Sequence, residues 1–386
     1  MASRPPNGTL IISPLFEHTL APPTGDLQAI GLIGAGFIVD DCHLPAYRQA
    51  GFPVTAICSR STLRANEVAA KHCIPTVHAN WHSLLDDETI GVIDIAVPPL
   101  SQPEIILEAC KRSHIHGILA QKPLAMDPIE GARLVHACHQ ANKVLVVNQN
   151  MRHDQAIRAC TSLVRSGWLG EPILATINLR AIPHWMPWSE GLRSLTTYIL
   201  SIHHLDTFRA WLGTPDRVMA SMRPDPRTLF PHSDGINLYI LEYDKGPRAL
   251  GIDDVWVGPI KSSGSEGCPG QPYVQFRVEG TEGWAEGTIG WPAWPARQPS
   301  TLDFASRNDP TTVQRPRWRE VWFPDAFAGP MSELLWQLKG GPVAELSGMD
   351  NLQTLALCEA VLVSGREKRT VEVKEFLPQT HQNPDY

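Results

Sequence analysis

Two histidines and an aspartate lie inside an otherwise apolar run, TTYILSIHHLD, over residues 196–206. In a helix over 194–212, His203 and Asp206 share one face with position 199, because residues three and four apart are neighbours. An imidazole whose ordinary pKa is about 6.5 can accept a hydroxyl proton at neutral pH. The run is therefore either a buried helix with satisfied polar groups or the proton-transfer centre of an enzyme.

A glycine-rich turn, GLIGAGFIV over residues 31–39, ends the first predicted strand and opens the first helix. Gly34 and Gly36 form a G-x-G pair, but Val39 stands where a third glycine would be. Such glycines allow a tight turn and let a pyrophosphate approach backbone N–H groups at a helix N-terminus. We predict a dinucleotide-binding turn. The alternative is a glycine turn kept only for packing of the helix against the strand.

The second predicted strand, PVTAICS, ends at Ser59 and Arg60 without a carboxylate. An acid in that place would bind the adenosine ribose of NAD, whereas an arginine accommodates the 2′-phosphate of NADP. We therefore predict that NADP is the preferred cofactor. If Arg60 is only a solvated surface charge, the protein accepts NAD as well.

The elements that position these residues follow a βαβα rhythm over residues 27–150. Short apolar strands alternate with helix-like segments, which predicts an α/β Rossmann domain with a doubly wound parallel sheet. One helix has a readable start, with Asp127 as the N-cap and Pro128 in the first helical position.

The second part of the chain, residues 151–386, contains alternating runs such as GINLYILEY and PYVQFRVEG. These predict an α+β domain with a large, mostly antiparallel sheet, in which substrate binding and oligomerisation are expected. Segments 258–272 and 291–317 are rich in Pro, Gly and Ser and are predicted to be long loops. A late helix, DNLQTLALCEAVLVSGREK, is expected to pack back on the first domain.

Composition excludes several classes of protein. Lys plus Arg number 33 against 40 Asp plus Glu, so nothing indicates a nucleic-acid or anionic-membrane surface. The eight cysteines show no CxxC pair and no metal-ligand spacing, which predicts no metal site and reduced thiols in a cytoplasmic protein. Residues 1–26 lack the apolar core of a signal peptide and are predicted to be an N-terminal extension. No run approaches the roughly 18 apolar residues needed to span a bilayer.

Two further segments, AVPPLSQPEI (96–105) and GILAQKPLAMDP (117–128), each follow a predicted strand. Together with the glycine turn and IHHLD, they resemble the Gfo/Idh/MocA oxidoreductases, the glucose-fructose oxidoreductase and inositol dehydrogenase family. The resemblance covers roughly residues 27–213. It implies that Lys122, in a Gln-Lys-Pro version of the family's Glu-Lys-Pro tripeptide, reaches the nicotinamide and the substrate hydroxyl.

The family's D-x-x-x-H-x-x-D pattern falls on Ile199, His203 and Asp206, so the first acid is missing. The resemblance makes His203 the partner of Lys122 in proton transfer, while His204 is expected to be structural. It also implies cofactor contacts at Gly34, Gly36, Phe37, Ile38, Ser59, Arg60, Pro98, Gln102, Gln121, Lys122 and Asn150. Substrate contacts are expected at Lys122, Arg152, Arg180, His184, Trp185, His203 and Asp206.

The segment RAIPHWMPWSEGLR over residues 180–193 combines aromatic and polar side chains of the kind that stack on sugar rings, and DDVW over 253–256 is a second candidate patch. We therefore expect an NAD(P)-dependent dehydrogenase or reductase of a sugar, polyol or related hydroxy compound. A tethered-cofactor glycoside-cleaving enzyme and a non-catalytic, ligand-sensing regulator are the alternatives. By analogy with the family, a homodimer or homotetramer is expected.

Overall fold

The computed structural model describes residues 19–181, 187–192, 194–228, 230–255, 273–290 and 298–378. Within these residues the chain divides into two compact units. One unit is formed mainly by Leu20–His153 together with Phe323–Glu359, and the other by Asp154–Trp322 together with Ala360–Glu375. Each unit is described in turn.

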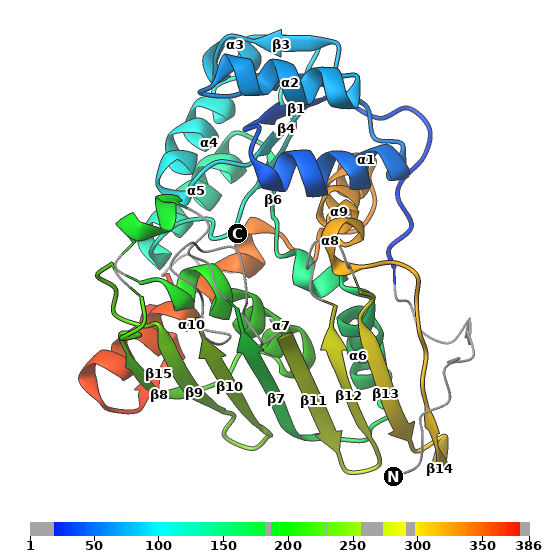
Figure 1. The fold of residues 1–386 in the computed structure, drawn as a ribbon, viewed down its shortest axis with the longest axis vertical. Coiled ribbons are helices and arrows are strands. Elements are labelled where there is room, and N and C mark those ends of the chain that lie inside the picture. The colour runs from blue at the N-terminus through cyan, green and yellow to red at the C-terminus, as the bar shows by residue number, and fades with distance from the viewer. Residues whose placement is uncertain are drawn as a thin grey trace. The chain divides into compact units, whose positions relative to one another are not determined.

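The first unit contains a six-stranded parallel sheet (Figure 1). Its order is β3-β2-β1-β4-β5-β6, so the chain moves outward from β1 to β3 and then crosses to the other side at β4. The strands are β1 (Ile30–Ile33), β2 (Val54–Cys58), β3 (Thr76–His78), β4 (Val92–Ile95), β5 (Gly117–Ala120) and β6 (Val144–Val147). Every residue of β1, β4 and β5 is buried, as expected for strands covered on both faces.

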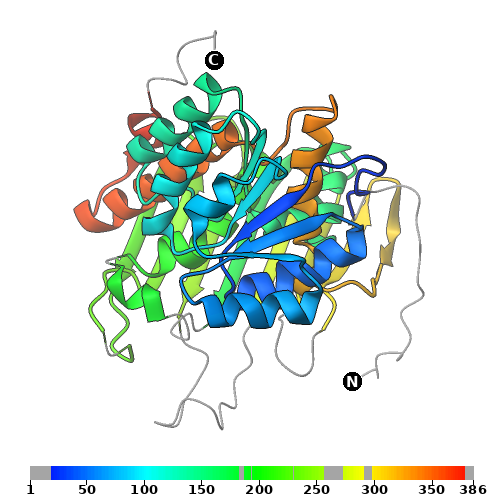
Figure 2. The same ribbon diagram turned by 90° about the horizontal axis from the view of Figure 1, so that it is seen from above.

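Helices cover this parallel sheet on both faces, which confirms the predicted fold class (Figure 2). The helices are α1 (Leu44–Ala50), α2 (Thr62–His72), α3 (Trp81–Leu85), α4 (Gln102–Cys110), α5 (Pro128–Gln140) and α9 (Ala328–Leu338). Side chains of α1, α2 and α9 join one core with β1, β2 and β4. The predicted start of α5 is confirmed, because the Asp127 side chain accepts a hydrogen bond from the backbone N–H of Glu130 at 2.8 Å.

The second unit contains a nine-stranded sheet in the order β14-β13-β12-β11-β7-β10-β9-β8-β15. All of its neighbouring strands run antiparallel except β7 and β10, which are parallel. The strands are β7 (Pro172–Arg180), β8 (Arg217–Arg223), β9 (Ile236–Glu242), β10 (Arg248–Asp254), β11 (Tyr273–Gly280), β12 (Trp284–Ile289), β13 (Thr301–Ser306), β14 (Asp309–Gln314) and β15 (Val371–Glu372). The predicted mostly antiparallel sheet is therefore confirmed.

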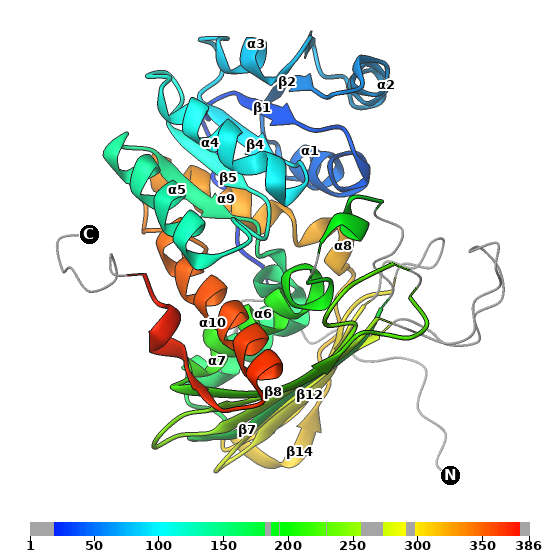
Figure 3. The same ribbon diagram turned by 90° about the vertical axis from the view of Figure 1, so that its left-hand side faces the viewer.

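Helices α6 (Gln155–Arg165) and α7 (Ile202–Leu212) cover one face of this sheet, and no helix of the described residues lies on its other face (Figure 3). The last part of α10 (Gly348–Glu367) belongs to the same unit. There, Ser364 Oγ accepts a hydrogen bond from the Ala220 N–H of β8 at 2.8 Å. No helix among the described residues is long and apolar enough to cross a membrane.

Two local predictions differ from the structure. The parallel sheet has a further strand, β3, whose three residues are too short to give an apolar pattern. The predicted loop 291–317 is wrong over β13 and β14, which form antiparallel pairs in the sheet. The predicted loop 258–272 and residues 291–297 lie outside the described residues.

The shorter helical turns complete the chain. Two are π-helical, η1 (Ile38–His43) and η5 (Thr197–Ser201), and α8 (Trp322–Asp325) is a kinked single turn. The others are 3₁₀ turns, namely η2 (Pro99–Ser101), η3 (Asn150–His153), η4 (Pro187–Gly191) and η6 (Val373–Phe376). Both π turns fall on segments that the sequence marked for chemistry, and π turns inside helices are frequent at functional sites.

Candidate active site

The predicted cofactor residues follow the carboxyl ends of the parallel strands. Gly34 follows β1, Ser59 follows β2, Pro98 follows β4, Lys122 follows β5 and Asn150 follows β6. Because these strands are parallel, all five residues lie at one edge of the sheet. Strand order reverses between β1 and β4, and ligands in open α/β sheets bind at such a switch point.

Gly34 occupies a backbone position that only glycine fits. Its φ is +127°, and a Cβ built there would lie 2.3 Å from the carbonyl oxygen of Ala96, which follows β4. Its N–H donates to the carbonyl oxygen of Cys58 at 2.9 Å. Gly36 differs, because no atom lies within 4 Å of a Cβ built on it. The first glycine thus serves the turn, and the second leaves open space beside the backbone.

The π turn η1 begins directly after the exposed Phe37, with Ile38 half-buried. Val39, which replaces the third glycine of the fingerprint, is fully buried in the core between helices and sheet. His43 ties the turn to β4, since its Nδ1 lies 2.5 Å from Asp94 Oδ2. The segment after the glycines is therefore anchored by two side chains. Val39 packs in the core, where a third glycine would have no side chain, and His43 contacts Asp94.

Ser59 is half-buried and Arg60 is exposed at the end of β2. A second arginine, Arg64, extends from α2 to the glycine turn, where its Nε donates to the carbonyl oxygen of Ala35 at 3.2 Å. Its guanidinium also pairs with Asp40, at 2.5 Å. No sequence pattern predicted this contact, because Arg64 belongs to an ordinary helical pattern.

The Asp40 carboxylate contacts two further side chains of α2. Lys71 Nζ and His72 Nε2 each lie 2.7 Å from its Oδ1. Burial opposes ionisation, but hydrogen bonds from Lys71, His72 and Arg64 outweigh it and lower the pKa of Asp40 to about 2. A permanent negative charge therefore holds these side chains beside the glycine turn.

Lys122 lies in the loop between β5 and α5, where its side chain is half-buried. Desolvation by burial lowers its pKa from 10.5 to about 7, and the nearby Cys358 opposes this only weakly. An amine that titrates near neutrality can both accept and release a proton. Gln121, which replaces the family's glutamate, accepts a hydrogen bond from the Lys122 N–H through its Oε1 at 3.1 Å.

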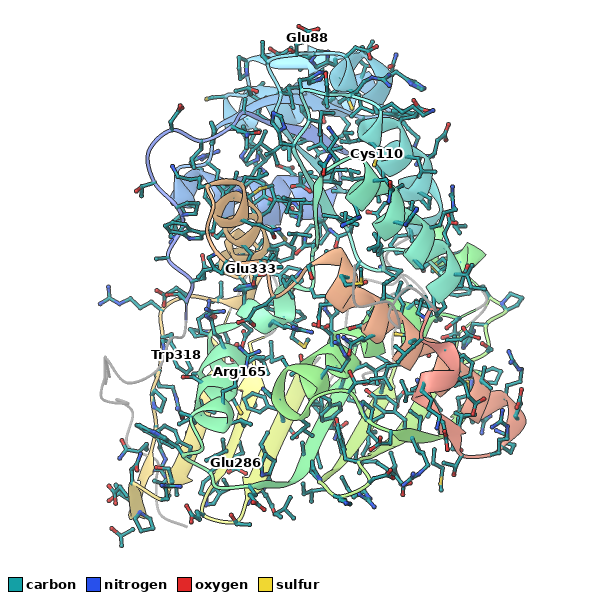
Figure 4. All side chains as sticks on the ribbon, turned by 180° about the vertical axis from the view of Figure 1, so that it is seen from behind. Glu88, Cys110, Arg165, Glu286, Trp318 and Glu333 are labelled. Carbon is teal, nitrogen blue, oxygen red and sulfur yellow. The ribbon has the colours of Figure 1, made fainter. Side chains whose placement is uncertain are left out.

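The neighbouring predicted contacts have partners of their own. Gln102 is fully buried and directs its side-chain amide at the loop that carries Lys122. Arg152 pairs with Asp350 at 3.0 Å, and Asn150 is buried in η3. His153 pairs with Glu333 of α9 at 2.8 Å (Figure 4).

His203 belongs to the second unit, in the first turn of α7. Its side chain is buried, and its ring meets that of Trp322 edge-on, with centroids 6.0 Å apart and planes at 85°. Ile199 is also buried, at the place of the family's first acid. Because η5 winds as a π turn, the α-helical spacing that we predicted between positions 199 and 203 is not kept.

His204 is fully buried and its Nδ1 lies 2.8 Å from Asp253 Oδ1 of β10. Ser201 donates a hydrogen bond to the other oxygen of the same carboxylate. Asp253 lies in the DDVW segment, which the sequence marked as a candidate sugar-binding patch. The carboxylate instead ties the start of α7 to the sheet.

A second buried carboxylate, Asp234, holds the preceding residues. It accepts hydrogen bonds from Ser194 Oγ at 2.8 Å and from the Leu195 N–H at 2.6 Å. It also accepts from both the N–H and the hydroxyl of Thr197, at 2.8 and 2.6 Å. Sequence reasoning missed Asp234, because a lone aspartate in a loop carries no signal of such contacts.

Two of the remaining predicted substrate residues form ion pairs within the second unit. Asp206 is buried and lies 3.6 Å from Arg209. Arg180 pairs with Asp254 at 3.3 Å. His184 and Trp185 lie outside the described residues.

A parallel sheet with a glycine turn at its switch point is the arrangement that dinucleotide-binding domains use. Residues 29–149 match the model of the oxidoreductase family with an NAD-binding Rossmann fold, GFO_IDH_MocA. The first unit of this chain thus matches the NAD-binding domain of the Gfo/Idh/MocA oxidoreductases, which supports the family that the sequence predicted.

Individual relatives extend the comparison beyond the first unit. D-apiose dehydrogenase from Paraburkholderia graminis is 24% identical over 89% of this chain and 89% of its own length. D-xylose 1-dehydrogenase (NADP(+)) 2 from Haloferax volcanii is 26% identical over 57% of this chain and 67% of that protein. An oxidoreductase from Agrobacterium radiobacter, solved with NAD+, L-tartaric acid and magnesium, has the same fold. Its TM-score is 0.77 at 22% identity, over 91% of this chain and all of that one.

Proposed function

We propose that this enzyme is a sugar or polyol dehydrogenase that transfers hydride between nicotinamide C4 and a carbinol carbon. The observation that carries the proposal is Lys122, an amine with a pKa of about 7 in the loop after β5. Relatives named as D-apiose and D-xylose dehydrogenases support the substrate class. The bound dinucleotide would supply the hydride chemistry, and the residues of the chain would supply binding and proton transfer.

In the proposed mechanism, Gly34 and Gly36 let the pyrophosphate approach the backbone after β1, and Lys122 and His203 handle the hydroxyl proton. A neutral Lys122 amine would accept the proton as the carbinol carbon is oxidised, and an ammonium would return it during reduction. His203 would assist as a second acid–base group. Phe37, Ile38, Pro98, Gln121 and Asn150 remain proposed cofactor contacts.

We further propose that NADP is preferred over NAD. Arg60 follows the end of β2, and neither of the residues beside it in the sequence is acidic. An arginine in that place favours a 2′-phosphate electrostatically. Arg60→Asp should raise KM for NADP by more than tenfold and change that for NAD little, as measured by initial rates with each cofactor.

For substrate binding we propose Arg152, Arg180, His184, Trp185 and Asp206. Arg180, Arg152 and Asp206 already pair with charged groups, so each would contact a sugar with the hydrogen-bonding capacity that remains. Arginine presents five N–H donors, which permits an ion pair and a hydroxyl contact at the same time.

The test is a screen of NADP and NAD reduction across aldoses and polyols, repeated with Lys122→Ala and His203→Ala. Turnover by the wild type and a large loss of kcat in both variants would support the proposal. Full activity in either variant would show that the assigned role is wrong.

A ligand-sensing or tethered-cofactor protein is the second candidate, favoured by the buried Ile199 where the family carries an acid. Retention of NADPH fluorescence through gel filtration, without turnover of added sugars, would favour it. Rapid release of the cofactor with turnover would favour the dehydrogenase.

We also propose a cytoplasmic homodimer or homotetramer. The face of the nine-stranded sheet opposite α6 and α7 supports an assembly, because Met219, Leu238 and Ile240 are 50%, 41% and 39% exposed there. Apolar side chains that cluster on an open sheet face are typical of an interaction surface.

A further inference from the structure

Gln102 is the first residue of α4, and its side-chain amide forms hydrogen bonds with a single loop, residues 121–124. Its Oε1 accepts from the Gln121 N–H at 2.6 Å. Its Nε2 donates to the carbonyl oxygens of Gln121, Pro123 and Leu124, at 2.8, 3.1 and 3.1 Å. The side chain is fully buried, so solvent cannot replace these bonds.

These bonds enclose Lys122. The loop residues 121–124 form no helix or strand, and Gln102 supplies partners on both sides of the lysine. The Lys122 N–H is itself held by Gln121 Oε1. Helix α4 is a firm support, because Ile105, Ile106 and Ala109 pack its inner face into the domain.

We propose that Gln102 is a positioning residue that holds the Lys122 loop in its reactive geometry. This rests on the proposed function, in which Lys122 exchanges a proton with substrate. Both N–H donors of the amide are already engaged by the loop, so Gln102 acts through Lys122 and not through a contact with the cofactor. A displacement of about 1 Å in a reacting group can lower a rate on the order of 100-fold.

The test compares Gln102→Met and Gln102→Glu with the wild type. Methionine keeps the length of the side chain and removes all of its bonds, whereas glutamate keeps the acceptor and loses the Nε2 donor. We expect kcat to fall on the order of 100-fold with KM for NADP within about twofold. Gln155→Met, at a buried glutamine of the other unit, should leave kcat unchanged. Thermal melting of each variant identifies any that fail to fold.

A second readout does not depend on activity. Lysines dimethylated with ¹³C give NMR signals that titrate individually, and the Lys122→Arg variant assigns the signal of Lys122. Its midpoint should lie near 7 in the wild type and move toward 10.5 in Gln102→Met, because a loosened loop admits water. If Gln102→Met changed neither the midpoint of Lys122 nor kcat, the positioning role would be overturned. A weaker NADP affinity with an unchanged midpoint would also overturn it, in favour of a cofactor contact. Full activity of Lys122→Ala would instead overturn the proposed function.

An independent observation concerns two thiols at the other end of α4. Cys110, labelled in Figure 4, ends α4, and its Sγ lies 3.7 Å from that of Cys138 in α5. Cys110 is partly exposed and Cys138 is buried. The hydrogen bond between the two thiols and the charge of Lys143 together lower the pKa of Cys110, against the effect of burial, whereas the same hydrogen bond and burial raise the pKa of Cys138.

We infer that Cys110 is an oxidation site whose product is resolved by Cys138. With hydrogen peroxide as the oxidant, the Cys110 thiolate attacks one oxygen, the O–O bond breaks and hydroxide leaves, which gives a sulfenic acid. The Cys138 thiol then attacks that sulfur, an S–S bond forms, and water leaves with the thiol proton. Lys143 is fixed for this role by the carbonyl oxygens of Arg112 and Ile115, at 2.7 and 2.5 Å.

Peptide mapping after treatment with peroxide tests this inference. We expect a Cys110–Cys138 disulfide in the wild type and in the control Cys73→Ser, which removes an exposed thiol elsewhere. In Cys138→Ser, dimedone should label Cys110, and Cys110→Ser should form neither product. Absence of the disulfide, or labelling of Cys73 in preference to Cys110, would overturn the inference.

Discussion

Lys122 differs from a surface lysine in one property, its pKa of about 7, and burial is the cause. In the oxidative direction the neutral amine must accept a proton, so kcat/KM should rise with pH through about 7. In the reductive direction the ammonium donates, and kcat/KM should fall through the same value. Initial rates from pH 5 to 9 in both directions measure this, and the limb near 7 should be absent in Lys122→Ala. Parallel profiles in the two directions would contradict the assignment.

The two glycines of the turn should respond differently to the same change. Gly34→Ala places a Cβ 2.3 Å from the Ala96 carbonyl oxygen at a φ of +127°, so we expect the apo protein to lose at least about 1–3 kcal/mol of stability. Gly36→Ala meets no atom within 4 Å and should leave apo stability unchanged while it weakens NADP binding. Urea unfolding and titration of NADPH fluorescence separate the two effects. Equal losses of apo stability would contradict this account of the turn.

At the scale of elements, the π turn before α7 is held by buried carboxylates. Asp253→Asn should cost about 1.5–3 kcal/mol, because it weakens charge-assisted hydrogen bonds from His204 and Ser201 inside the unit. The adjacent Asp254 is partly exposed and pairs with Arg180 and Arg227, so Asp254→Asn should cost less than about 1 kcal/mol. Chemical denaturation of both variants measures the difference, and equal costs would show that burial of Asp253 carries no weight.

Periodicity predicted most elements, because apolar strands and amphipathic helices carry their burial pattern in the sequence. It failed at β13 and β14, because the prolines that precede β13 concealed strands that are stabilised by neighbours in the sheet. It also failed at both π turns, since a repeat near 3.6 does not reveal an inserted residue. The glycine turn and Lys122 could be read from local motifs. Contacts made by Arg64 and Gln102 join segments far apart in the chain and needed the fold.

For the whole molecule, the open face of the nine-stranded sheet is the surface on which we expect a second copy to pack. Met219 and Ile240 are cross-strand partners on β8 and β9 and stand half exposed on that face. Ile240→Lys should therefore weaken association and shift the protein toward the monomer in light scattering after size-exclusion chromatography, because a charge buried in an apolar interface is costly. Ile129→Lys is the matched control, since Ile129 is 82% exposed on α5 of the other unit and should leave the assembly unchanged. A wild-type monomer, or an assembly insensitive to Ile240→Lys, would place the contacts elsewhere.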